Sequence, residues 1–352
     1  MNQKTNELAA VNVLDWTLAG YNGDTVAANQ QLLNATLKYD GGELHFPDYG
    51  IVLVEPEQPS GKDVVLSCAV HGDETAPIEM VRDMIHGIMR GELQPVQRTL
   101  FLIANPAAIA IGKRFVEMNM NRLFSGAHQE GQSREHQRAA QLEQVITDFF
   151  AAAPEGRRER YHYDLHTAIR DSEFEKFAVY PFTHGAPYKK QQLTFLAECG
   201  VETILLNQAP TTTFSYYSAR THEADAFTVE LGKVRPFGEN DRRKFAAAQT
   251  MFTKLICERE LKLPEFDANR TRVFDVCRTI NRTVENFTLH FPDDVANFTA
   301  FEKGELLATD GEQEYLVEQS GERIIFPNAK VALGQRALLT VVEVPFMQLQ
   351  LV

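Results

Sequence analysis

The sequence predicts an α/β protein with a mixed, mainly parallel sheet flanked by helices and a smaller C-terminal β domain. Residues 64–70 form a continuous apolar run, which is typical of a strand buried on both faces. A helical repeat follows, and a second apolar run within residues 97–105 completes a strand–helix–strand unit, as in a parallel sheet. After Pro264 the sequence changes to short β-type runs with no clear helix between them. We therefore expect one domain over residues 1–263 and a second over residues 264–352.

The same patterns predict the other elements in chain order. Residues 8–18 carry a weak helical pattern, whereas residues 112–124 lack a regular period and are assigned to a loop. Residues 211–220 are polar and aromatic, and we expect them to cover the site. Helices are expected at residues 78–88, 138–150, 187–200 and 241–262. Strands are expected at residues 44–46, 50–54, 161–166, 177–182, 201–206, 226–230, 272–276, 283–291, 314–318, 322–326 and 337–344.

Composition and charge narrow the classes of function. The 352 residues include 35 basic and 48 acidic side chains, which give a net charge of −13. Such an acidic chain is a poor candidate for binding nucleic acid or an anionic membrane, although a local cluster of arginines can still bind an anionic substrate. The four cysteines include no Cys-x-x-Cys pair, so a cysteine-based zinc site is not expected. The N-terminus lacks a secretory pattern and no apolar run reaches the length of a membrane span, so we expect a cytoplasmic protein.

His71 and Glu74 lie three positions apart on the turn between the first buried strand and its helix. Open α/β sheets form ligand sites at such carboxyl ends of strands. An imidazole and a carboxylate at this spacing can reach one cation, and Zn²⁺ accepts both, with three protein ligands and water at a catalytic site. His166 is the favoured third ligand because it lies at the end of a later strand, and His162 is the alternative. Asp164 either orients a ligand histidine or is a buried strand residue with a backbone partner.

Two further segments carry charged residues that could serve a site. Glu230 ends an apolar run, where a carboxylate is costly unless it is paired or functional, so it is either a catalytic base or a structural ion-pair partner. Arg114, Asn121 and Arg122 lie beside large apolar residues in the predicted loop. That loop is either a solvated surface segment or an anion clamp, since the arginine fork binds carboxylates through two hydrogen bonds.

Several segments, taken together, resemble a known protein family. They are residues 71–77 (His-Gly-Asp-Glu-Thr-Ala-Pro), Arg114 with residues 121–124 (Asn-Arg-Leu-Phe), residues 164–167 (Asp-Leu-His-Thr), Tyr216 with Arg220, and residues 229–232 (Val-Glu-Leu-Gly). This set is similar to the aspartoacylase and succinylglutamate desuccinylase branch of the zinc carboxypeptidase superfamily, and the resemblance covers most of residues 50–260. The branch also carries a C-terminal β domain, which fits the β-rich tail.

Within this branch the resemblance is strongest to the succinylglutamate desuccinylases. Their signature often has Asn where this sequence has Asp73, a change that lies between two metal ligands and removes neither. In the aspartoacylases an Asp stands three residues before the Arg of the Asn-Arg pair, whereas this sequence has Asn119 there. That difference argues against a preference for acetylaspartate.

The resemblance implies a role for each site residue. One Zn²⁺ per subunit would be bound by His71, Glu74 and His166, and the metal would lower the pKa of a water molecule toward neutrality. Glu230 would act as general base and then as general acid. Arg114 would stabilise the oxyanion of the tetrahedral intermediate. Substrate carboxylates would be bound by Asn121, Arg122, Tyr216 and Arg220.

The implied reaction is the zinc-dependent hydrolysis of N-succinyl-L-glutamate to succinate and L-glutamate, the last step of the arginine succinyltransferase catabolic pathway. One alternative is an enzyme with another substrate, either a deacylase of another N-acyl amino acid, as in the aspartoacylases, or a carboxypeptidase-like enzyme. A second alternative is a zinc-containing sensor of acidic metabolites without catalysis. The sensor is disfavoured because structural zinc usually has four protein ligands, often cysteines. The implied partner is a small anionic substrate, and the sequence is compatible with a homo-oligomer.

Overall fold

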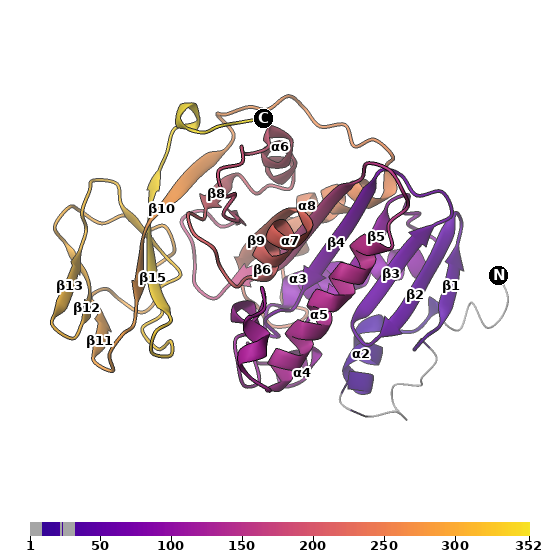
Figure 1. Cartoon of the computed structure of the whole chain (residues 1–352), viewed down its shortest axis with the longest axis horizontal. Coiled ribbons are helices and arrows are strands. Elements are labelled where there is room, and N and C mark those ends of the chain that lie inside the picture. Colours follow the sequence, from indigo (N-terminus) through magenta and orange to yellow (C-terminus); the bar gives the residue numbers. More distant parts are fainter. Residues whose placement is uncertain (1–8, 22, 24–31) are drawn as a thin grey trace.

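The centre of the fold is a group of parallel strands, which confirms the α/β class expected from the sequence. The computed structural model describes residues 9–21, 23 and 32–352, and Figure 1 shows their arrangement. The central strands lie in the order β5 (Arg98–Ile103), β4 (Lys62–Cys68), β6 (Glu159–Ala168) and β9 (Asp225–Lys233). Their side chains are buried almost throughout because helices cover both faces of the sheet.

Antiparallel pairing extends the sheet to twelve strands and makes it mixed. Beyond β5 the sheet continues through β3 (Ile51–Pro56), β2 (Gly42–Asp48) and β1 (Thr36–Tyr39). Beyond β9 it continues through β7 (Phe177–Tyr180), β8 (Thr203–Leu206), β10 (Arg272–Asn281), β15 (Arg336–Glu343) and β14 (Arg323–Ile325). Because β7 is antiparallel to β9 and parallel to β8, the direction of the strands reverses at β7.

Helices cover the two faces because alternate side chains of each strand point to opposite sides. On one face, Val64 and Leu66 of β4 share a core with α2 (Val13–Tyr21), α3 (Thr75–Met89), α6 (Lys190–Glu198) and α8 (Arg242–Cys257). On the other face, Val65 shares a core with α5 (Arg134–Ala151) and α7 (Phe214–His222). The ends of the central strands are therefore held between two helical layers. No helix in the described part of the chain is both long and apolar enough to cross a membrane.

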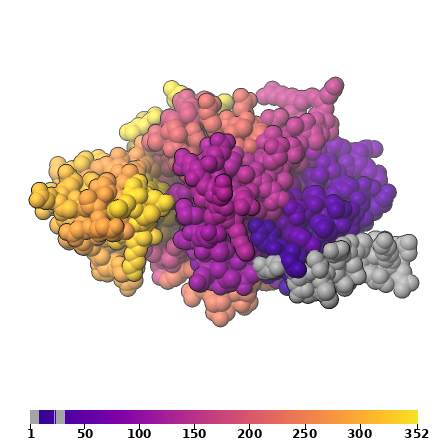
Figure 2. Space-filling view, turned by 60° about the horizontal axis from the view of Figure 1, so that its bottom comes forward, coloured from indigo at the N-terminus to yellow at the C-terminus, as the bar shows by residue number. Residues whose placement is uncertain are grey.

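The C-terminal residues form a lobe at one end of the molecule, coloured orange to yellow in Figures 1 and 2. A small sheet with the order β11 (Phe287–Leu289), β12 (Leu306–Asp310) and β13 (Gln313–Leu316) lies in this lobe, which has its own apolar core. The lobe is joined to the main sheet through β10, which pairs with β8. This confirms the smaller C-terminal β part, and the division between residues 263 and 264 stays a prediction. The last residues return to the first domain, where the Tyr188 N–H donates to the Gln350 carbonyl oxygen.

Several segments differ from the sequence-based expectation. Most of residues 211–220 belong to helix α7, which the sequence did not predict and which is capped by the Thr213 side chain. Phe214 and Tyr217 face the core from this helix, and the expectation that the segment covers the site stays a prediction. Of the weak helical pattern at residues 8–18, Ala9 and helix α2 from Val13 onward are helical, and Leu8 lies outside the described residues. Strands β1 and β12 and several short helices were not expected, the helices being α4 (Pro106–Ala110), η1 (Met120–Arg122), η2 (Ala127–Glu130) and η3 (Phe346–Gln348).

Candidate active site

The turn after β4 holds His71 and Glu74 at the carboxyl end of the central strands. Ala69 has a φ of 60°, so the chain leaves the strand direction just before this turn. Gly72 lies so close to α4 that a Cβ at this position would be 2.3 Å from the carbonyl carbon of Ala108. Only glycine allows this approach. Glu74 is the residue before the first residue of α3, so its carboxylate lies at the start of a rigid helix.

His71, Glu74 and His166 form a buried cluster that could hold a metal ion. Nδ1 of His71 lies 2.8 Å from Oε1 of Glu74, and Nδ1 of His166 lies 2.8 Å from Oε2 of the same carboxylate. One ligand atom from each residue lies within 4.8 Å of the others. His166 comes from the end of β6, next to β4 in the sheet. The sequence-based ligand candidates are therefore brought together, whereas His162 lies four residues earlier in β6, beside Ser67.

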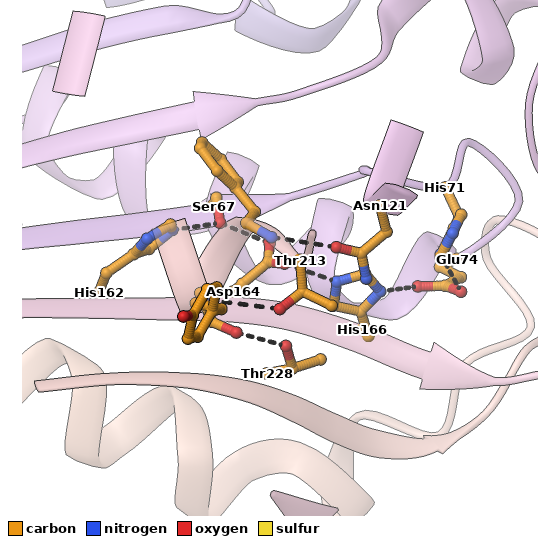
Figure 3. A network of polar contacts seen from close by, with 12 residues as sticks. Ser67, His71, Glu74, Asn121, His162, Asp164, His166, Thr213 and Thr228 are labelled. Carbon is orange, nitrogen blue, oxygen red and sulfur yellow. Dashed lines mark hydrogen bonds and ion pairs between the residues drawn. The ribbon is translucent and has the colours of Figure 1, made fainter. Parts of the chain in front are cut away.

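A chain of polar contacts behind His166 fixes the orientation of its ring, as Figure 3 shows. Nε2 of His166 lies 2.8 Å from Oδ2 of Asp164, and the Ser67 hydroxyl donates to Oδ1 of Asp164 at 2.6 Å. The Ser67 oxygen is 2.8 Å from Nε2 of His162, whose Nδ1 is 2.7 Å from the Ser218 hydroxyl. When one ring nitrogen of an imidazole donates to a carboxylate, the other ring nitrogen is unprotonated and can bind a metal. Asp164 thus has the contacts of a residue that orients a ligand.

Burial and neighbouring charges set the protonation of the cluster. Burial, aided by the Arg114 charge, lowers the pKa of His71 to about 4. For His166, burial opposes the charged form, but the carboxylates of Asp164 and Glu74 raise its pKa well above the usual value. Burial likewise opposes ionisation of Glu74, but the two histidines hold its pKa well below the usual value. These directions favour an ionised Glu74 and a neutral His71, the states that metal ligands require, whereas the raised pKa of His166 favours its protonated form, which has to lose a proton when a metal binds.

Glu230 lies directly beside the cluster. It is the register partner of His166 across the parallel strands β6 and β9. Its side chain is buried, and within the described residues its Oε2 has no hydrogen-bond partner. Burial is the main cause that raises the pKa of Glu230 to about 7, and the charge of Glu74 adds to it. A carboxylate with a pKa near neutrality and a free oxygen can both accept and return a proton.

The loop over residues 112–124 brings Arg114 and Asn119 to the cluster. Nη1 of Arg114 donates to Oε1 of Glu74 at 2.7 Å, and Oδ1 of Asn119 lies 3.0 Å from Nε2 of His71. The loop is tied to the turn after β4 because the Gly72 N–H donates to the Arg114 carbonyl oxygen. The contact between Asn119 and His71 was not foreseen, although Asn119 stands out in the sequence as a polar residue between two methionines.

The remaining candidates are Asn121, Arg122, Tyr216 and Arg220, which the resemblance assigns to binding substrate carboxylates. Asn121 accepts a hydrogen bond from the Phe214 N–H through Oδ1, which leaves its amide N–H groups as donors. Burial and the charge of Arg114 lower the pKa of Arg122 to about 10. The buried Tyr216 lies on α7, with its hydroxyl 3.0 Å from Nε2 of the exposed His184. Arg220 is exposed on the same helix and makes no polar contact with the cluster in the described ranges.

Comparison with known proteins relates these features to one family. Residues 60–256 match the family model of the succinylglutamate desuccinylase/aspartoacylase catalytic domain. Residues 269–344 match a second model, described as the AstE/AspA barrel-sandwich hybrid domain. The two matches cover both the mixed sheet with its site and most of the C-terminal lobe.

Similar proteins include three that are named succinylglutamate desuccinylase and one aminoacylase. The chain is 62% identical over 321 residues to a succinylglutamate desuccinylase from Idiomarina loihiensis, covering 91% of this chain and 93% of that protein. It is 51% identical over 305 residues to a protein of the same name from Shewanella denitrificans, covering 85% and 87% of the two chains. The crystal structure of the succinylglutamate desuccinylase from Chromobacterium violaceum superposes with a TM-score of 0.82 at 36% identity, over 95% of this chain and 98% of that chain. Murine aminoacylase 3 shares the fold with a TM-score of 0.56 at 17% identity, over 82% and 97% of the two chains.

Proposed function

Because this chain belongs to the succinylglutamate desuccinylase/aspartoacylase family, we propose that it is a zinc-dependent amidohydrolase that cleaves N-succinyl-L-glutamate into succinate and L-glutamate. The names of the relatives support the substrate, and the cluster of His71, Glu74 and His166 supports a metal-dependent reaction. The observation that carries the mechanism is the pairing of His166 with Glu230 on neighbouring strands. The reaction is the last step of the arginine succinyltransferase pathway and takes place in the cytoplasm.

The residues of the cluster fit a catalytic zinc site. Two imidazole nitrogens and one carboxylate converge from β6 and from the turn after β4, a donor set that Zn²⁺ accepts with one position left for water or substrate. Co²⁺ and Mn²⁺ accept the same donors, so the choice of zinc also depends on which metal the cell supplies. When bound, the metal ion supplies a Lewis acid that polarises the amide carbonyl and lowers the pKa of a water molecule.

Glu230 moves the proton in this reaction. Its unpartnered Oε2 accepts a proton from the attacking water, while the water oxygen forms a bond to the amide carbonyl carbon. Glu230 then donates that proton to the amide nitrogen as the carbon–nitrogen bond breaks, and glutamate leaves as a neutral amine. A pKa raised to about 7 suits both steps, because the proton is easily taken up and easily returned.

Arginines and polar groups around the cluster bind and polarise the substrate. Arg114 stabilises the negative charge that develops on the carbonyl oxygen, a role for which its position next to Glu74 is suited. Substrate carboxylates are bound by Arg122 and by the amide N–H groups of Asn121. Tyr216 and Arg220 bind the substrate from α7, Arg220 from its exposed position near the end of that helix. Assembly into a homo-oligomer stays a prediction. Sedimentation of the purified protein measures its oligomeric state.

A substrate panel tests this function. The zinc-loaded protein is assayed with N-succinyl-L-glutamate and N-acetyl-L-aspartate in parallel, with a chelator control. Succinate release that the chelator abolishes, with little acetate release, is the expected result. Acetate release without succinate release would assign the protein to the aspartoacylase side of its family. Binding of zinc without hydrolysis of either substrate would contradict the proposal and favour the sensor.

A further inference from the structure

The loop that carries Arg114 has little packing of its own. Residues 111–119 form no helix or strand, and the side chains of Phe115 and Met118 are 36% and 38% exposed. The position of the loop beside the cluster therefore depends on polar contacts of its backbone. The Gly72 N–H holds the Arg114 carbonyl oxygen on one side. The middle of the loop is held by a carboxylate from another element.

That carboxylate belongs to Glu135, in the first turn of helix α5. The side chain is buried, and its Oε1 accepts the Val116 N–H at 2.7 Å and the Glu117 N–H at 3.3 Å. Oε1 also accepts Nδ2 of Asn105, the residue that caps α4, at 3.5 Å. The contact is reciprocal, because Oε1 of Glu117 accepts the Arg134 N–H at 3.4 Å. Two carboxylates thus fasten the loop to the start of α5.

Within the described residues the Glu135 carboxylate forms no ion pair. Its hydrogen bonds come from amide N–H groups, and its Oε2 is buried without a hydrogen-bond partner. The buried carboxylate of Asp63 differs, because it forms ion pairs with Arg98 and Arg158. Burying a carboxyl group costs free energy unless hydrogen bonds replace those lost to water. At Glu135 these hydrogen bonds come chiefly from the loop backbone, so the burial of the side chain and the position of the loop depend on each other.

The held backbone lies close to the base of the Arg114 side chain. Arg114 is two residues from Val116, so at most roughly 7 Å of chain separates their Cα atoms. Its guanidinium reaches Oε1 of Glu74 at 2.7 Å, although 28% of the side chain is exposed. A long, partly exposed side chain keeps such a contact only if its backbone stays in place. A misplacement of about 1 Å in a group that acts on the reacting atoms can cost on the order of a hundredfold in rate.

We propose, on the basis of the proposed function in which Arg114 stabilises the oxyanion, that Glu135 is a positioning residue for Arg114. By holding the backbone at residues 116–117, it keeps the guanidinium where the carbonyl oxygen of the substrate gains negative charge. Within the described residues Glu135 makes no hydrogen bond to the three residues of the cluster, so it acts on the reaction only through the loop.

Glu135→Leu tests the proposal because it removes the acceptor and keeps a side chain of similar size. In the zinc-loaded protein we expect kcat for N-succinyl-L-glutamate to fall roughly 10- to 100-fold, with the zinc content unchanged. The KM is expected to change less than about threefold, since the Phe214 N–H holds Asn121 separately. An unchanged kcat, or a KM that rises as much as kcat falls, would overturn the proposal.

Glu135→Gln keeps an oxygen that can accept the Val116 N–H, so its loss of kcat is expected to be smaller than that of Glu135→Leu. A glutamine variant as slow as the leucine variant contradicts the role of this hydrogen bond. If Glu135→Leu does not fold, Glu135→Gln takes its place in the comparisons with Arg114 and with the control, where a lowered kcat is again expected and an unchanged kcat overturns the proposal.

A double-mutant cycle with Arg114 separates positioning from a general loss of structure. If Glu135 acts through Arg114, then Glu135→Leu lowers kcat no further, within about twofold, in a protein that already carries Arg114→Gln. The same reduction in both backgrounds would overturn the proposal. Asp310→Leu is the matched control, because Asp310 is a buried carboxylate that accepts the N–H groups of the consecutive residues Thr283 and Val284 in the C-terminal lobe. We expect its kcat to be unchanged, and a loss equal to that of Glu135→Leu would contradict a specific role.

Hydrogen exchange tests the holding of the loop independently of activity. If the wild type hydrolyses neither N-succinyl-L-glutamate nor N-acetyl-L-aspartate, the proposed function fails. Exchange of the amide hydrogens of residues 113–119, followed by mass spectrometry, then decides whether Glu135 holds the loop. Exchange roughly 10-fold faster in Glu135→Leu than in the wild type and in Asp310→Leu supports this role, and equal rates in the three proteins overturn it.

Discussion

His166 on β6 and Glu230 on β9 are register partners across adjacent parallel strands. In such a pair the two backbones are held by the ladder, so the relative position of the side chains does not depend on a mobile loop. One of the two lies in the metal-ligand cluster, and the other has the raised pKa and free oxygen of a base. The sheet itself therefore sets the geometry between the proposed metal ligand and the proposed base.

His166→Gln and His162→Gln form a matched pair that tests the third ligand. Both histidines are buried in β6 two turns of the pleat apart, and glutamine retains much of the volume of the ring. We expect the first variant to lose stoichiometric zinc and the second to keep it, because only His166 has its Nδ1 at the cluster. Metal analysis after gel filtration measures this. Zinc loss in His162→Gln with retention in His166→Gln would reverse the assignment.

Asp164→Asn tests whether the carboxylate orients His166. The substitution keeps the shape of the side chain but removes the charge that faces Nε2 of the imidazole. Zinc affinity is expected to fall roughly 10- to 100-fold, the usual effect of losing such a partner. Competition with a chromophoric chelator gives the affinity. Unchanged affinity in a folded variant would mean that the neighbouring Ser67 and His162 hold the ring without the carboxylate.

Gly72→Ala tests whether the close packing of Gly72 against the Ala108 backbone positions His71. A Cβ at Gly72 would meet the backbone of Ala108 at 2.3 Å, so the turn must move. We expect the free energy of unfolding to fall by about 2 kcal/mol or more, together with weaker zinc binding. Gly61→Ala is the control, since nothing lies within 4 Å of its Cβ position. Equal denaturation midpoints for the two variants would contradict the close packing.

The raised pKa of Glu230 predicts the acid side of the pH profile. Only the ionised carboxylate accepts a proton from water, so kcat is expected to fall as the pH drops through the pKa of Glu230. Burial raises that pKa to about 7, and a cation bound at the neighbouring cluster favours the carboxylate, so the midpoint lies at or below about 7. Measuring kcat from neutral to acid pH checks this. A kcat that rises on acidification would rule out Glu230 as the base.

The parts of the site that lie close together in sequence were the easiest to predict. His71 and Glu74 share one turn, and a buried strand followed by a helix fixes where that turn lies. His166 lies at the end of a predicted strand and Glu230 ends an apolar run, and parallel strands bring such ends to one edge of the sheet. The fold class followed from the same runs because burial on both faces leaves an unbroken apolar pattern.

Other features could not be predicted because their cause is not local. Helix α7 was missed since Phe214 and Tyr217 are aromatic residues without strong helix preference, and packing against the sheet decides their conformation.

Glu230→Gln tests the division of roles between the cluster and the base most directly. The variant keeps the size of the side chain but cannot take up a proton. We measure zinc content and succinate release from N-succinyl-L-glutamate in the same preparation. The expected result is one zinc per chain, as in the wild type, with kcat lowered by on the order of a hundredfold or more. A variant that keeps both zinc and the wild-type rate, or that loses zinc, would contradict the assignment of Glu230 as a base beside a three-residue metal site.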